Sequence, residues 1–327
     1  MTRFGYHASH EQYPPSVLLE YVRLAEDAGF DGVLGADHFH PWLDENGHSG
    51  AVWSWLGAAM QATSGPYITV NAPGDRYHPA VVAQSAATLA EMFPGRFRLA
   101  IGTGEALNEH ITGNPWPSKP ERQRRLLECA PVRRARWRGE TVTQRGMGTG
   151  VEARLYSLPD APPPLFGAAV SERTAEWVGG WADGLITTGR PREEMAKMIA
   201  AFHRGGGEGK PVHVQHVLSW APREADARRI AHEQWRFAAI GEPDKLWDLR
   251  TPPDFAAAAR GLTPHDVAEK VPVSADPGVH AELLRGYAEL GVEQVYCFNV
   301  GPNQREFIER FGAEVLPALA GVRPASV

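Results

Sequence analysis

The sequence is poor in cysteine and lysine and has no long apolar run. Its 327 residues include two cysteines, Cys129 and Cys297, which are far apart and lack the spacing of metal ligands. Both lie in apolar stretches, so we expect buried free thiols and neither a disulfide framework nor a metal site. Such cysteine usage is typical of a reducing compartment, and we expect the protein to be cytoplasmic.

The sequence also lacks the features of a membrane or nucleic-acid binder. No stretch approaches the roughly twenty apolar residues that a membrane helix needs. The N-terminal segment MTRFGYHASHEQ lacks the apolar core of a signal peptide. The formal net charge is -6, whereas binding to nucleic acid or anionic lipid requires a basic face. We therefore expect a small-molecule substrate, no nucleic acid and no membrane.

Short apolar runs alternate with helical patterns along the chain. Most of the runs are continuously apolar, which is typical of parallel strands that are buried on both faces. The expected strands are Phe4–Ala8, Gly32–Ala36, Tyr67–Ala72, Phe97–Gly102, Leu165–Val170, Gly184–Thr188, Val212–Ala221 and Gln294–Val300. The expected helices are Pro15–Gly29, Pro79–Met92, Lys119–Trp137, Glu172–Trp181, Pro191–His203 and Pro277–Leu290.

This alternation predicts an α/β fold, a (β/α)₈ TIM barrel with insertions that forms a single domain over residues 1–327. A doubly wound sheet is the second choice, but no Gly-rich turn follows the first strand as that fold requires. Two polar or irregular stretches interrupt the rhythm at 44–50 and 139–164. Long loops in a compact barrel are usually lids or binding loops.

The second expected strand ends in GADHFHPW, which places Asp37, His38, His40 and Trp42 where a barrel presents its catalytic groups. Histidine is well suited to proton transfer near neutral pH, and Asp37 can anchor a cofactor or fix the imidazole tautomer. Two other interpretations stay open, because His38 and His40 can ligate a metal and a buried histidine can simply bond to a backbone carbonyl.

The fourth expected strand ends in AIGTGEALNEH, which places Glu105 at the barrel mouth. Glycines beside it allow close approach of the backbone to a ligand. The run lacks the lysine of a P-loop and the third glycine of a Rossmann fingerprint, so neither is expected. A tight turn capped by Glu105 is the structural alternative.

Other strand ends carry polar groups toward the same mouth. Glu11 follows the first strand together with His7 and His10, and Arg76 follows the third. Ser171 is a natural N-cap at the start of a helix whose amides can bind an anion. Thr188 and Arg190 follow the sixth strand and can add a second anion site.

The motifs GADHFHPW, GTGEALNE, RYHPA and GGWADGLIT together resemble the luciferase-like TIM-barrel superfamily, in particular the branch of F420-dependent glucose-6-phosphate dehydrogenases. The similarity extends over nearly the whole chain. The resemblance implies hydride transfer between a hydroxyl-bearing substrate and coenzyme F420, and it suggests a homodimer. FMN is the alternative cofactor, because one sub-branch is suspected of using an ordinary flavin.

The resemblance also implies individual roles. His38 is the expected general base, Glu105 serves the N1 side of the cofactor, and Trp42 and Glu11 steady charge at the substrate. Asp37 is expected to contact the pyrimidine ring of the cofactor. Further cofactor contacts are expected from Thr69, Val70, Gly104, Asn108, Ala168, Ala169, Val170 and Ser171, with a cis peptide bond between Thr69 and Val70.

The sequence departs from the sugar-phosphate enzymes in its substrate pocket. Thr188 and Lys270 match expected substrate-binding positions and Arg190 can substitute for a lysine, but the Lys-His pair of the family is missing from AAIGEPDKLWDLRTPPDF. Val170 and Ser171 replace a Gly-Gly pair. Glucose 6-phosphate is therefore a doubtful substrate.

Three alternatives to an F420-dependent dehydrogenase stay open. One is an FMN-dependent reductase or monooxygenase on the same scaffold. Another is a metal-dependent barrel hydrolase that uses His7, His38 and His40. The third is a non-catalytic binding barrel, which the many polar strand ends disfavour because such groups cost stability unless they are used.

Overall fold

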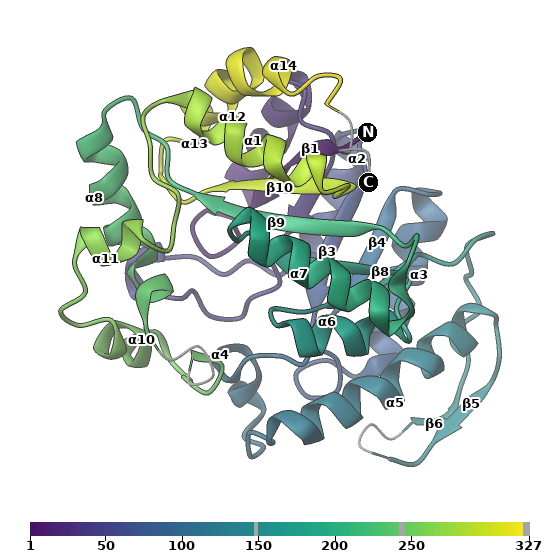
Figure 1. The fold of residues 1–327 in the computed structure, drawn as a ribbon. Helices are drawn as coiled ribbons and strands as arrows, with labels where there is room; N and C mark the ends of the chain where they lie inside the picture. The colour runs from purple at the N-terminus through teal and green to yellow at the C-terminus, as the bar shows by residue number, and fades with distance from the viewer. Residues whose placement is uncertain (147–149, 242–245, 323–327) are drawn as a thin grey trace.

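The computed structural model of the chain describes residues 1–146, 150–241 and 246–322. In this part of the chain, parallel strands close into a barrel in the order β1-β10-β9-β8-β7-β4-β3-β2 (Figure 1). Their bounds are β1 Arg3–Ala8, β2 Val33–Gly35, β3 Tyr67–Asn71, β4 Phe97–Ile101, β7 Leu165–Ala168, β8 Gly184–Thr188, β9 Val212–Leu218 and β10 Gln294–Asn299. The predicted TIM barrel is confirmed, and the doubly wound alternative is wrong because the sheet closes on itself.

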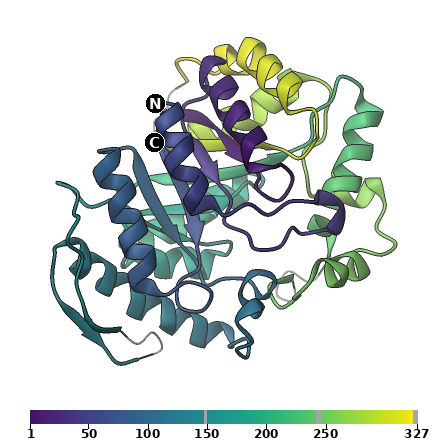
Figure 2. The same ribbon diagram turned by 180° about the vertical axis from the view of Figure 1, so that it is seen from behind.

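Helices surround the barrel on its outside, as the two opposite views show (Figures 1 and 2). Between the strands lie α1 Pro15–Asp27, α2 Val52–Ala62, α3 Pro79–Met92, α4 Ala106–Glu109, α5 Lys119–Trp137, α6 Glu172–Gly179, α7 Arg192–Phe202, α8 Glu224–Trp235, α10 Pro252–Ala258, α11 Pro264–Ala268 and α12 Pro277–Glu289. After the last barrel strand come α13 Gln304–Arg310 and α14 Leu316–Ala318. Each of the described helices is too short or too polar to span a bilayer.

The first helix illustrates why these segments fold as they do. Pro15 occupies the first turn of α1, where its missing amide hydrogen costs nothing. Leu18, Val22 and Ala25 repeat at helical spacing and are buried against the barrel. The helix ends before Gly29, which adopts the left-handed φ of +95° that glycine tolerates best.

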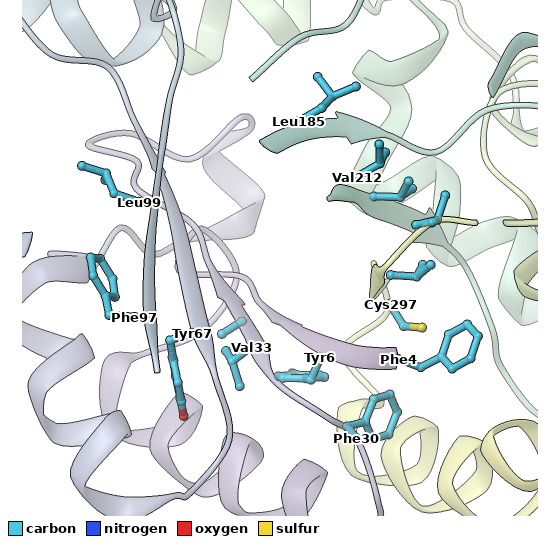
Figure 3. Packing of buried hydrophobic residues seen from close by; sticks show 14 of the residues in the cluster. Phe4, Tyr6, Phe30, Val33, Tyr67, Phe97, Leu99, Leu185, Val212 and Cys297 are labelled. Carbon is cyan, nitrogen blue, oxygen red and sulfur yellow. The ribbon is translucent and has the colours of Figure 1, made fainter. Parts of the chain in front are cut away.

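Two hydrophobic layers hold the barrel together. The residues that face outward from the strands, such as Tyr67, Phe97 and Leu99, pack against the helices (Figure 3). The alternate residues, such as Leu34, Ile68 and Ala100, fill the barrel interior. This alternation follows from the two-residue period of a strand and leaves the polar groups to the strand ends.

Several sequence expectations differ from the structure. The peptide bond between Thr69 and Val70 is not cis, since the described residues contain no cis bond and the pairing of β3 with β4 runs regularly through both positions. The stretch 139–164 is less irregular than expected, because Val142–Gln144 (β5) and Gly150–Ala153 (β6) form an antiparallel hairpin, drawn beside α5 in Figure 1.

The helices after β9 form a cap beside the barrel mouth. Buried aromatic residues of this cap, Trp235, Phe237 and Phe255, form one cluster with Trp42 from the segment after β2. Residues far apart in sequence thus enclose one side of the mouth, where the candidate site lies.

Candidate active site

The carboxyl ends of the barrel strands surround a cavity of about 370 Å³. Most of the residues proposed from the sequence line it, namely Glu11, Asp37, His38, Trp42, Val70, Gly104, Glu105, Asn108, Ala168, Ala169, Val170 and Thr188. They come from almost every strand of the barrel. The position follows the rule that barrel enzymes build their sites from the loops at this end of the strands.

The centre of the cavity holds a carboxylate and an imidazole from neighbouring strands. Nε2 of His38 lies 3.3 Å from Oε1 of Glu11, and both side chains are largely buried. Ser9 donates a hydrogen bond of 3.0 Å to the other carboxylate oxygen of Glu11. Because β1 and β2 pair directly, the two side chains meet at the same edge of the sheet.

The polar insertion after β2 fixes the backbone of this pair. The amide of His48 donates to the carbonyl of Glu11 at 3.0 Å, and the hydroxyl of Ser49 donates to the carbonyl of His38 at 2.8 Å. The stretch expected at 44–50 as a functional loop therefore positions the two groups rather than contacting the cavity itself.

Asn108 determines which nitrogen of His38 carries the proton. Its Oδ1 accepts a hydrogen bond of 2.8 Å from the amide of Phe39, so its Nδ2 is the atom that faces Nδ1 of His38 at 3.3 Å. An amide nitrogen only donates, so Nδ1 must accept and Nε2 must carry the hydrogen. In this tautomer Nε2–H is directed at Glu11.

The same amide group connects His38 to the second candidate carboxyl. Nδ2 of Asn108 also donates to Oε2 of Glu105 at 3.3 Å. Burial raises the pKa of Glu105, and the nearby carboxylates of Glu11 and Glu109 raise it further, while His38 and Arg76 act in the opposite direction. A carboxyl whose pKa is raised in this way can be a hydrogen-bond donor to a ligand at a higher pH than an exposed one.

Asp37 belongs to a buried network of charges on the other side of the site. Nη2 of Arg76 lies 3.2 Å from Oδ1 of Asp37, and the backbone amide of Arg76 donates to Oε2 of Glu109 at 2.8 Å. Asn71 donates to Oδ2 of Asp37 at 2.7 Å and Tyr77 to Oδ1 at 3.3 Å. With its carboxylate bonded on both oxygens, Asp37 is fixed in one orientation at the cavity wall.

An aromatic wall closes the side of the cavity beneath the cap. The ring of Trp42 stacks on Phe237 with centroids 4.9 Å apart, meets Phe255 edge-on at 5.2 Å and lies 4.9 Å from the ring of His38. Trp247 also lines the cavity. Trp42 shields one side of the imidazole from water, which strengthens electrostatic interactions there.

Small residues line the opposite side. Gly104 has a φ of +83°, and a Cβ at this position would come within 3.0 Å of the Cβ of Ala72. Gly102, Val70 and Ala168 line the cavity beside it. The backbone here leaves room for a ligand to approach closely, as the sequence predicts for the GTGE run.

Four of the proposed residues do not line the cavity. Thr69 is buried, and its hydroxyl donates to the carbonyl of Gly35 at 2.9 Å. Ser171 caps α6 by accepting from the amide of Thr174. Arg190 donates to the hydroxyls of Thr187 and Thr188 at 3.3 and 3.4 Å. The remaining residue, Lys270, is exposed just beyond α11.

Sequence reasoning missed the polar groups that α5 brings to the cavity, Lys119, Arg122 and Gln123. Arg122 stacks on Trp116 at 4.3 Å and donates to the carbonyl of Pro117 at 2.7 Å. Three polar residues at the start of a long helix were visible in the sequence, but only the packing of α5 directs them to the mouth. Asn71, the partner of Asp37, was missed because it ends an otherwise apolar strand.

The three histidines of the hydrolase hypothesis have separate partners. His7 stacks on Phe298, His38 pairs with Glu11, and His40 stacks on His110 with centroids 5.2 Å apart. In the described ranges, no three histidine, cysteine or acidic side chains are arranged to hold a metal ion.

Comparison with known proteins gives consistent matches. The family model for the luciferase-like monooxygenases matches residues 1–294. An F420-dependent glucose-6-phosphate dehydrogenase of Beutenbergia cavernae is 36% identical over 330 residues, which cover 98% of each chain. The enzyme of the same name from Microbacterium testaceum is 34% identical and covers 97% of each chain.

Solved structures show the same architecture. An F420-dependent secondary alcohol dehydrogenase, solved with an F420-acetone adduct, superposes with a TM-score of 0.89 at 32% identity and covers 97% of this chain and 99% of its own. The F420-dependent tetrahydromethanopterin reductase of Methanopyrus kandleri has a TM-score of 0.76 at 21% identity, covers 97% of this chain and 99% of its own, and supports the fold alone.

Proposed function

This chain belongs to the luciferase-like monooxygenase family, and we propose that it is an F420-dependent oxidoreductase that transfers hydride between a hydroxyl-bearing substrate and the deazaflavin. The observation that carries the proposal is the Glu11–His38 pair, which lies in one cavity with Glu105 and is bridged to it by Asn108. Relatives of more than 30% identity that cover nearly the whole chain carry F420-dependent names.

The residues of the cavity fit this cofactor. Gly102, Gly104 and Ala168 line the cavity and provide the space in which a ring can lie. Glu105 is available as a hydrogen-bond donor to a ring atom because burial raises its pKa. Arg76 and Asn71 hold the carboxylate of Asp37 in one orientation at the cavity wall, where a cofactor ring can contact it. When bound, F420 supplies a ring carbon that accepts a hydride from the carbinol carbon of the substrate.

The acid–base work falls to Glu11 and His38 together. His38 was expected to accept the hydroxyl proton alone, but in the tautomer that Asn108 favours its Nε2 already carries a hydrogen. We therefore assign proton acceptance to the carboxylate of Glu11, while Nε2–H of His38 donates to the substrate oxygen and stabilises its negative charge. In the reverse direction, the protonated carboxyl of Glu11 returns the proton to the substrate oxygen, while Nε2–H of His38 again donates a hydrogen bond to that oxygen.

Trp42 positions this pair. Its ring packs against His38 and is itself held between Phe237 and Phe255, so the imidazole can turn little about its side-chain bonds. The aromatic wall also keeps water away from the oxygen on which charge develops. We assign substrate binding to the same wall and to Thr188 on the opposite side of the cavity.

The chain is further proposed to act as one domain over residues 1–327, as a homodimer and in the cytoplasm. One hydrophobic cluster includes both Phe4 and Leu319, which supports a single domain. Exposed apolar side chains on α3, Val81 and Met92, offer a surface for a second copy. Sedimentation at several concentrations tests the dimer, because a monomer at every concentration would contradict it.

Titration with F420 and FMN, each followed by fluorescence, tests the cofactor. We expect saturable binding of F420 and much weaker binding of FMN. Tight binding of FMN without binding of F420 would contradict the proposal and favour a flavin-dependent reductase or monooxygenase. His38→Ala serves as the site control, since it should retain F420 affinity and lose turnover.

A further inference from the structure

Three side-chain amides meet behind the acid–base pair, outside the cavity. Gln12 directly follows Glu11 in the sequence. Asn46 lies in the polar loop after β2, and Gln234 lies on α8 of the cap. Gln12 and Asn46 are 8% and 4% exposed, and Gln234 is half-buried. None of these amides is among the described residues that line the cavity, so the proposed mechanism leaves them without a role.

Gln234 joins the other two amides through a single oxygen atom. Its Oε1 accepts a hydrogen bond of 3.1 Å from Nε2 of Gln12 and another of 3.2 Å from Nδ2 of Asn46. Its backbone carbonyl accepts a longer bond of 3.3 Å from the same Nδ2. An amide oxygen has two lone pairs, so the two side-chain donors saturate Oε1.

Backbone groups fix the orientation of both donors. Nε2 of Gln12 also donates to the carbonyl of Val300 at 2.8 Å, and a carbonyl can only accept. Oδ1 of Asn46 accepts from the amide of Leu43 at 3.1 Å, so Nδ2 is the atom that faces Gln234. A side chain without an acceptor at position 234 would therefore leave one buried N–H of each amide unpaired, which is costly.

The network connects the cap to the backbone of the acid–base pair. The polar loop that contains Asn46 also donates hydrogen bonds to the carbonyls of Glu11 and His38. Gln12 attaches the segment of Glu11 to α8 directly. Both members of the pair are thus linked to the side-chain oxygen of Gln234 through short chains of hydrogen bonds.

The next residue of α8 connects the same helix to the aromatic wall. The ring of Trp235 lies 6.5 Å from that of Trp42, and Trp42 packs on His38. Because Gln234 and Trp235 are adjacent, the docking of α8 places the amide network and the wall together. The end of one helix therefore acts on the backbone of the pair and on the packing of its imidazole.

We propose that Gln234 is a positioning residue for hydride transfer, because its side-chain oxygen holds Glu11 and His38 in their working arrangement. This inference rests on the proposed function. Gln234 itself takes no proton and does not line the cavity. Loss of its acceptor should loosen the pair, so that proton removal and the accompanying hydride transfer become slower while substrate and cofactor still bind.

Gln234→Leu and Gln234→Glu form the test. Leucine has no acceptor, whereas the carboxylate of glutamate accepts from both amides. We expect Gln234→Leu to lower kcat for a secondary alcohol roughly ten- to hundred-fold, with little change in KM or in F420 affinity. Gln234→Glu should keep kcat within about three-fold of wild type. Equal kcat in wild type and Gln234→Leu would overturn the proposal, as would equal losses in the two variants.

Arg236→Met is the matched control. Nη2 of Arg236 donates to Oε1 of Glu45 at 2.7 Å, so this pair joins the same two segments as the contact between Gln234 and Asn46. We expect kcat within about two-fold of wild type, because an ion pair with an exposed partner is weak. A loss as large as that in Gln234→Leu would mean that any contact between the loop and the cap suffices, which would contradict a specific role.

Histidine NMR tests the same geometry without turnover. In cofactor-free protein with isotope-labelled histidine, the Nε2–H resonance of His38 is identified by its loss in His38→Ala. We expect this resonance to shift in Gln234→Leu, because the hydrogen bond to Glu11 changes, and to return to its wild-type position in Gln234→Glu. An unchanged resonance in Gln234→Leu would overturn the inference.

The outcomes distinguish this inference from the proposed function. If the wild-type protein does not reduce F420 with an alcohol but the His38 resonance responds to Gln234→Leu, the proposed function fails and the role of Gln234 in orienting the pair stands. If the wild type reduces F420 and Gln234→Leu has the same kcat, the proposed function stands and the inference is wrong.

Discussion

Oε1 of Glu11 lies 3.3 Å from Nε2 of His38, although the two side chains come from different strands of the barrel. The direct pairing of β1 with β2 places them together, and the loop at 44–50 holds the backbone of both. Asn108 then sets the tautomer of the imidazole from its other side. Three segments of the chain therefore define one acid–base pair.

Glu11→Gln tests the role of the carboxylate. Glutamine keeps the shape of the side chain but cannot accept a proton, so kcat should fall by about 10²- to 10⁴-fold. F420 affinity should change little, because the proposed cofactor contacts lie on other strand ends. Glu20→Gln, on the exposed side of α1, is the control and should have wild-type kinetics. A Glu11→Gln variant with near wild-type kcat would show that the proton leaves by another route.

Asn108→Asp tests the tautomer. An aspartate accepts a hydrogen bond where asparagine donates one, so it favours a hydrogen on Nδ1 of His38 and hence the protonated ring. We expect kcat to fall and the acid limb of the kcat/KM profile to move to higher pH. A lower kcat with an unmoved acid limb would indicate that Asn108 serves only to bind the cofactor or to stabilise the fold.

Glu105→Gln tests the consequence of its raised pKa. Burial raises the pKa of Glu105 in the folded protein above its ordinary value of 4.5. The folded state therefore binds the proton more tightly, and the stability that this group contributes is present below pH 4.5 and lost as the pH rises through the folded pKa. The free energy of unfolding of the cofactor-free Glu105→Gln variant should therefore rise relative to that of wild type as the pH is raised from about 5 to about 8.

Urea unfolding at both pH values measures this gain, and Glu306→Gln on the exposed side of α13 controls for surface charge. If the difference in unfolding free energy between Glu105→Gln and wild type does not change with pH, the pKa of Glu105 is the same in the folded and unfolded states. That result would contradict the prediction.

Arg76→Met tests the buried charge network. The change leaves Asp37 and Glu109 buried without their cation, and loss of one partner of such a pair costs about 3–5 kcal/mol. Arg138→Met, which breaks the exposed pair with Glu140 at 2.7 Å, should cost at most about 1 kcal/mol. Similar losses in the two variants, measured by chemical denaturation, would show that the buried network adds nothing specific.

Much of the barrel is predictable from the sequence because its strands are continuous apolar runs. The ends of the strands are harder to predict, because the apolar runs continue beyond the last residue that pairs with a neighbouring strand. Val170 is apolar but follows the end of β7 and is 45% exposed, and Trp220 is buried although β9 has ended. The helix α2 has no polar cap and no polar face strong enough to mark it, so Val52–Ala62 was not anticipated.

The site is predictable where a residue lies within a few positions of a strand end, as Asp37, His38 and Glu105 do. It is not predictable where tertiary packing decides. Arg190 follows β8 and yet bonds to Thr187 and Thr188, while Arg122 reaches the cavity from a helix. Whether such a residue lines the cavity depends on the direction of its side chain and on how α5 crosses the barrel mouth. Neither can be predicted from a local sequence pattern.

The most direct test of the central claim is a hydride-transfer experiment with a secondary alcohol deuterated at its carbinol carbon. The enzyme is mixed with F420 and this alcohol, and the reduced cofactor is examined by mass spectrometry. We predict that the cofactor gains the deuterium, that the undeuterated alcohol reacts faster, and that His38→Ala and Glu11→Gln form little reduced cofactor. Reduction without deuterium transfer, or no reduction of F420 while FMN is reduced, would contradict the account.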